Sequence, residues 1–150
     1  MAKLKTDKYI VTEVRADKLF PTEKPGAGRP TDGKHVTPTH IMWLDGDIIP
    51  GAFYSESVWI WPESSSDEPA ALEHTHAFTE CVTFFGTNFN DPRDLGGEVE
   101  LWLDGEKHVM TKSFLAYIPA GMKHCPLIVR NVKRPIFHFT VGLGGDYIRK

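Results

Sequence analysis

The sequence has few cysteines, no excess of positive charge and no long apolar run. Only Cys81 and Cys125 are present, so we expect two buried, reduced thiols, with a disulfide or a redox role as the alternative. The formal net charge is -3 and there is no basic run, which argues against a nucleic-acid partner. No stretch approaches the roughly 18–20 apolar residues that cross a bilayer, so no membrane span is expected.

Signals for targeting and for several common catalytic sites are also missing. Residues 1–6 contain lysines but no apolar segment follows them, so we expect no secretory signal and a cytoplasmic location. The serines at positions 64–66 lie in a polar linker without the G-x-S-x-G pattern of a serine nucleophile. No glycine-rich loop that would cradle a phosphate precedes a helix. Residues 16–20 are expected to form at most a turn or a short helix.

Strand-like segments dominate the chain. They are rich in β-branched and aromatic residues and recur about every 8–12 residues, with glycine and proline between them, which is typical of a β-sandwich or barrel. Asp104-Gly105 predicts a tight hairpin turn. We predict an all-β fold in a single domain, 1–150. The predicted strands are 8–14, 40–44, 52–61, 73–85, 98–103, 107–111, 114–118, 127–129 and 136–141.

Loops divide this domain into two parts. Residues 1–38 are predicted to form an N-terminal arm and a Pro/Gly-rich loop from 21 to 38, and residues 39–150 to form the barrel. A turn-rich insert, 87–97, separates two strands and is expected to lie over the barrel mouth.

Residues with metal-binding chemistry occur in two separate runs. His74, His76 and Glu80 differ by even numbers, so on one strand their side chains would share a face. The second run, 119–124, ends in His124, which would come from a neighbouring strand. Three imidazoles and a carboxylate form a ligand set for a divalent metal ion.

This pair of runs resembles the two motifs of the cupin superfamily, G-x5-H-x-H-x3,4-E-x6-G and G-x5-P-x-G-x2-H-x3-N. The first is matched at His74, His76, Glu80 and Gly86, although the step from 80 to 86 is one residue short. The second is matched at Pro119, Gly121 and His124. Glu68, Ser113 and Ile128 stand where the motifs have Gly, Gly and Asn. The resemblance implies a small cupin-type jelly-roll β-barrel whose metal ligands are His74, His76, Glu80 and His124.

The sequence does not decide which metal binds or which other residues take part in the site. Fe, Mn, Ni, Co and Zn all suit imidazole with carboxylate. The alternative is that the four residues are polar groups inside the barrel without a metal. His138 is a candidate base or substrate contact beside the metal, and His40 shares that ambiguity; a structural histidine is the alternative for both. Trp59 and Trp61 are expected in the core or an interface, with substrate stacking as the alternative.

The resemblance implies a metal-dependent enzyme acting on a small oxygen-containing molecule. With Fe(II) this implies a dioxygenase, an oxidoreductase in which substrate and O2 share the metal. With Mn, Ni or Zn it implies an isomerase, lyase or decarboxylase. The alternative is a non-catalytic module that binds a small molecule or a metal. The resemblance also implies a homodimer, for which residues 8–14 and the Pro-rich segment after them are the candidate interface.

Overall fold

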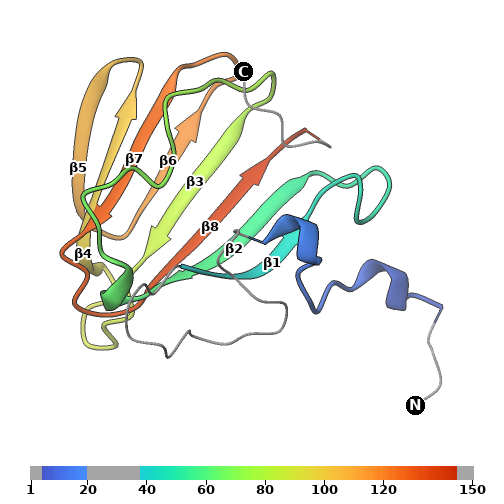
Figure 1. The fold of residues 1–150 in the computed structure, drawn as a ribbon, viewed down its shortest axis with the longest axis horizontal. Coiled ribbons are helices and arrows are strands. Elements are labelled where there is room, and N and C mark those ends of the chain that lie inside the picture. The colour runs from blue at the N-terminus through green and yellow to red at the C-terminus, as the bar shows by residue number, and fades with distance from the viewer. Residues whose placement is uncertain (1–4, 20–37, 145–150) are drawn as a thin grey trace.

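A computed structural model describes residues 5–19 and 38–144, and nearly half of them lie in β-strands (Figure 1). Three short 3-10 turns accompany the strands: η1 (Asp7–Tyr9), η2 (Ala16–Lys18) and η3 (Pro62–Ser64). Within these described ranges, no helix is long and apolar enough to span a bilayer. The strands are β1 (Thr39–Leu44), β2 (Tyr54–Ile60), β3 (Glu80–Phe85), β4 (Asp94–Leu103), β5 (Glu106–Lys112), β6 (Phe114–Ile118), β7 (His124–Arg130) and β8 (Ile136–Gly142).

The strands form two antiparallel sheets that pack against each other (Figure 1). The larger has the order β1-β2-β8-β3-β6 and the smaller the order β5-β4-β7. Apolar side chains from both sheets make one core, which includes Val58 and Phe84 from the larger sheet and Val99 and Val129 from the smaller. The predicted all-β jelly roll is confirmed. In the part of the chain that the structure describes, no strand pair joins the sheets, so the predicted closed barrel is wrong in that detail.

The residues of the larger sheet alternate between an inner, core-facing side and an outer side. In β8, Ile136, His138, Thr140 and Gly142 are buried, whereas the residues between them are half-buried. Residues paired across antiparallel strands share a face, so the register defines rows that cross the inner face. One row is His40, Val58, His138, Phe84 and Phe114; the next is Trp43, Glu56, Thr140, Val82 and Ala116; a third holds Tyr54, Gly142, Glu80 and Ile118.

The turn between β4 and β5 is the hairpin that the sequence predicted. Leu103 pairs with Glu106, and the two residues between them have positive φ, 48° at Asp104 and 82° at Gly105. Two consecutive left-handed residues match the right-handed twist of the flanking strands, which is why Asp-Gly is favoured there.

The N-terminal arm differs from the prediction. Residues 8–14 form no strand: η1 covers Asp7–Tyr9, and no regular structure follows until η2. Their β-branched composition lacks a partner strand in the described sheets, and composition alone does not form a strand without one. The short helix expected within 16–20 is present as η2, whereas the Pro/Gly-rich loop lies outside the described residues apart from Pro38. The homodimer stays a prediction.

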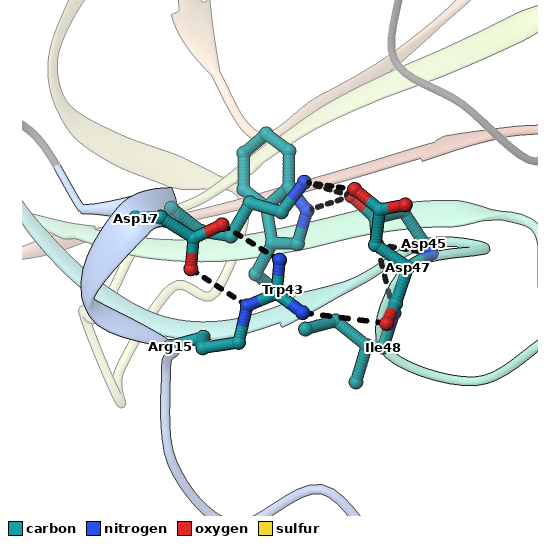
Figure 2. A network of polar contacts seen from close by, with 7 residues as sticks. Arg15, Asp17, Trp43, Asp45, Asp47 and Ile48 are labelled. Carbon is teal, nitrogen blue, oxygen red and sulfur yellow. Dashed lines mark hydrogen bonds and ion pairs between the residues drawn. The ribbon is translucent and has the colours of Figure 1, made fainter.

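Charged contacts fix η2 onto the loop that joins β1 and β2 (Figure 2). The ammonium of Lys18 lies 2.6 Å from the Asp45 carboxylate, which also accepts hydrogen bonds from the Trp43 indole N–H at 2.7 Å and from two backbone N–H groups. Burial opposes ionisation of Asp45, but Lys18 and Trp43 outweigh it and lower the pKa of this carboxyl. The arm is therefore held against the loop that follows β1.

Candidate metal centre

The segment that carries His74 and His76 is not the strand that the sequence predicted. β3 begins at Glu80, and the two histidines lie in an irregular stretch before it, so the prediction of one strand over 73–85 is wrong. His74 forms an isolated antiparallel bridge with His124, with N–H to C=O distances of 3.0 Å in both directions. Strand parity is therefore not what brings these side chains together.

Backbone contacts and one aromatic ring hold this irregular stretch in place. The N–H of Gly121 donates to the carbonyl of His76 at 2.8 Å. The ring of Phe78 lies where side chains at Gly142 and Gly144 would collide with it, so both positions require glycine. The His76 imidazole stacks on this ring, with centroids 4.6 Å apart. Phe78 thus sets the position of His76 against the end of β8.

The second run forms a tight turn that leads into β7. The N–H of Met122 donates to the carbonyl of Pro119 at 3.1 Å, and Gly121 has a φ of 80°, which favours glycine. The turn delivers His124 to the first position of β7, opposite His74. Ser113, where the motif has glycine, instead accepts a hydrogen bond from the Gly86 N–H at 2.9 Å and ties the β3–β4 loop to the start of β6.

The structure brings the four predicted ligands together in two overlapping groups. In one group the ligand atoms of His76, Glu80 and His124 lie within 4.8 Å of one another, and in the other those of His74, His124 and Cys125 do. The Glu80 carboxylate lies 3.2 Å from Nε2 of His124 and 3.6 Å from Nε2 of His76. Each of these five residues is at most 8% exposed.

Backbone carbonyls orient two of the imidazoles. Nδ1 of His74 lies 2.6 Å from the Leu72 carbonyl, and Nδ1 of His124 lies 3.0 Å from the Met122 carbonyl. A carbonyl oxygen can only accept a hydrogen bond, so Nδ1 must be the nitrogen that carries the hydrogen. In a neutral ring, Nε2 then keeps its lone pair. The His124 lone pair then faces a carboxylate oxygen at 3.2 Å, and two acceptors this close require a cation or a proton between them. This donor set fits a divalent transition metal.

Three of the four predicted ligands border a cavity of about 560 Å³ between the two sheets. Its wall includes His74, Glu80 and His124, and its remaining lining is largely apolar, with Val82 and Phe84 among it. Residues 17–19 of the N-terminal arm also line it. The arm and the ligand cluster therefore enclose one space.

A second buried polar cluster borders the same cavity. Glu56 lies between two histidines of the neighbouring row: Nε2 of His40 is 3.0 Å from one carboxylate oxygen, and Nε2 of His138 is 3.9 Å from the other. Nδ1 of His138 lies 2.9 Å from the Thr83 carbonyl, and its Nε2 lies 3.2 Å from the Thr140 hydroxyl. His138, a candidate from the sequence, is thus placed on the cavity wall together with His40.

The charges of this base cluster, His40, Glu56 and His138, follow from burial and pairing. Burial lowers the pKa of His138, and the nearby Glu56 only partly offsets this. Burial alone would raise the pKa of Glu56, but hydrogen bonds from His40 and Tyr54 and the charges of the two histidines together outweigh it, so that the pKa is lowered. Near neutral pH the cluster therefore contains an ionised Glu56 beside a neutral His138.

Two residues of the cavity were not found from the sequence. Glu56 lies among Tyr54, Val58 and Ile60, which share its strand parity, and a lone carboxylate on an apolar face was a usable signal. Cys125 was expected to be buried, which is confirmed, but not to lie beside the ligands.

The alternative role for Trp59 in substrate stacking finds no support. Trp59 lies on the outer side of β2, where it stacks on Trp61 with centroids 5.9 Å apart and contacts Phe137. Trp43, by contrast, lines the cavity.

No protein-family model and no curated protein sequence matches this chain. Similar solved structures include an oxalate oxidase in complex with glycolate, at 16% identity and a TM-score of 0.49, covering 75% of this chain and 54% of that one. They also include a cupin 2 domain-containing protein from Halorhodospira halophila, at 15% identity and a TM-score of 0.49, covering 76% and 69% of the two chains. A conserved protein with a double-stranded β-helix domain from Klebsiella pneumoniae has the same identity and TM-score, with 81% and 87% covered.

At this level of identity and TM-score, these similarities carry no argument about activity. The chain spans about half the length of the oxalate oxidase that it resembles. What the site does must be argued from its own residues.

Proposed function

We propose that the protein is a metal-dependent enzyme that acts on a small, oxygen-containing molecule, with the ion held by His74, His76, Glu80 and His124. One observation carries this proposal: the buried Glu80 carboxylate lies 3.6 Å from Nε2 of His76 and 3.2 Å from Nε2 of His124, beside a cavity that Glu80 and His124 line. Three imidazoles and a carboxylate suit a divalent ion, and the backbone carbonyls at Nδ1 of His74 and His124 are contacts of the kind that orient metal-binding imidazoles.

The cavity supports a small-molecule substrate. Its volume, about 560 Å³, lies within the roughly 300–1,000 Å³ of ligand pockets. Apolar side chains such as Val82 and Phe84 line this space, and such a lining favours the expulsion of water when a substrate binds. A bound divalent ion would polarise a substrate carbonyl or carboxylate oxygen placed there.

The base cluster supplies a proton acceptor on the same wall. Because the Thr83 carbonyl fixes the proton of His138 on Nδ1, its Nε2 is the basic atom. Transfer of a substrate proton to that nitrogen creates an imidazolium, which the Glu56 carboxylate at 3.9 Å stabilises. His40 holds Glu56 through the 3.0 Å contact on its other oxygen.

The test is turnover by protein reconstituted with single metals under anaerobic conditions, using dicarbonyl and catechol compounds. We expect turnover that requires metal and is lost in Glu80→Gln. Oxygen uptake with Fe(II) would assign the dioxygenase branch, and turnover without oxygen the isomerase, lyase or decarboxylase branch. Metal binding without turnover in any of these assays would overturn the enzymatic proposal and leave a binding module.

A further inference from the structure

Cys125 does not lie where a regular strand would place it. Adjacent residues of a strand face opposite sides, so the neighbour of an inward His124 should face outward. Instead Cys125 has a φ of 70°, and both residues are buried and line the cavity. The left-handed backbone at this single position turns the thiol toward the ligand cluster.

Two imidazoles lie next to this thiol. The ligand atoms of His74, His124 and Cys125 lie within 4.8 Å of one another, and the paired backbones of the two histidines fix their relative position. A thiolate with two imidazoles is a ligand set for thiophilic ions such as Zn²⁺, whereas a carboxylate with imidazoles also suits harder ions such as Mn²⁺.

We propose that Cys125 gives the metal centre a second, softer ligand set that overlaps the first at His74 and His124. Thiophilic ions bind through His74, His124 and Cys125, and harder ions through the four ligands proposed above, His74, His76, Glu80 and His124. Coordination by sulfur replaces the S–H bond with a metal–sulfur bond and releases the proton to solvent, without a change in oxidation state. The inference rests on the proposed metal centre, because His124 belongs to both sets.

The full-length protein offers a matched control for this proposal. Cys81 also follows a ligand directly, but it pairs with Tyr117 and Val141 on the outer side of the larger sheet. Cys81→Ser therefore removes a thiol one residue from a ligand without touching the cavity. Cys125→Ser keeps the size of the side chain but adds a polar hydroxyl, whereas Cys125→Ala keeps the position apolar but removes the sulfur's volume, so a folding defect in one variant is checked by the other.

The first measurement is the absorption spectrum of protein loaded with Co²⁺, a spectroscopic probe for Zn²⁺. We expect a sulfur-to-cobalt charge-transfer band in the wild type and in Cys81→Ser, and its loss in both Cys125 variants. Cobalt bound without that band in the wild type would overturn the second ligand set and leave the metal centre standing. Failure of cobalt to bind at all would overturn both.

The second measurement is competition for Zn²⁺ and Mn²⁺ against a chelator. In Cys125→Ser, we expect Zn²⁺ affinity to fall by at least roughly 10–100-fold, which is the loss typical when a residue that orients a metal ligand is replaced. Mn²⁺ affinity should be unchanged. In Glu80→Gln, we expect the opposite result: Mn²⁺ affinity falls and Zn²⁺ affinity is unchanged. Equal losses for both ions in Cys125→Ser would contradict a choice of ligands by the softness of the ion.

Discussion

The two polar clusters of the cavity are built in different ways. The proposed metal ligands His74 and His124 are oriented by carbonyls two residues before them, Leu72 and Met122. The base cluster depends on pairing between strands, because His40, Glu56 and His138 come from β1, β2 and β8. Local contacts therefore set the first cluster, and the register of the larger sheet sets the second. Changes in one should leave the other intact.

The largest effect is expected at His124, which both ligand groups share. His124→Ala should lower the affinity for Zn²⁺ and for Mn²⁺ by more than about 100-fold, because it removes a ligand from each set. Chelator competition measures both. His108→Ala, an exposed histidine of β5, is the control and should bind as the wild type does. If both variants bound Zn²⁺ and Mn²⁺ with the same affinity, His124 would not be a metal ligand.

Removing the charge of the base cluster should affect stability rather than metal binding. Glu56→Gln takes the carboxylate from between two buried imidazoles, so we expect a loss of about 1–3 kcal/mol in the free energy of unfolding at neutral pH. Urea denaturation with chelator present measures it. Glu106→Gln, exposed on β5, should be neutral. A metal affinity that falls with Glu56→Gln would show that the clusters are not separable.

The pH dependence of stability should report His138. Its pKa is lower in the folded protein than in the unfolded chain, so the unfolded chain binds more protons as the pH falls. Its contribution is complete above roughly pH 6.5 and is lost below it, toward the folded pKa. The lowered pKa of Glu56 adds a second loss below roughly pH 4.3. In metal-free protein, His138→Gln should reduce the loss of stability that begins below roughly pH 6.5. If the variant and the wild type lost stability equally there, His138 would not be its cause.

The smallest effect is expected at the arm. Lys18→Met removes the ion pair with Asp45, which is worth about 1 kcal/mol or less at a partly exposed position. Because Lys18 also lines the cavity, we expect faster loss of metal to a chelator at nearly unchanged affinity. Lys112→Met, at the exposed end of β5, is the control. Equal release rates would show that the arm does not limit access.

The contrast between the clusters explains what the sequence could predict. The four candidate ligands could be selected from the spacing of the motifs, and their side chains lie close together even though residues 74–79 form no strand. Most strands were also found, because alternation and turn residues are local signals. Residues 8–14 were misassigned because strand composition says nothing about an available partner.

The rest depended on long-range geometry. His40 and Glu56 are 16 positions apart and meet through the register of β1 and β2, including a shift between His40 and Met42 that no local pattern shows. The inward direction of Cys125 follows from a single positive φ, which the sequence does not specify for a non-glycine residue.

The central claim is that His74, His76, Glu80 and His124 hold a metal ion, and elemental analysis tests it most directly. Protein purified without chelator should contain about one transition-metal ion per chain. His124→Ala should have lost most of it, because His124 belongs to both ligand groups, while His108→Ala should retain it. The same metal content in all three proteins would contradict the site.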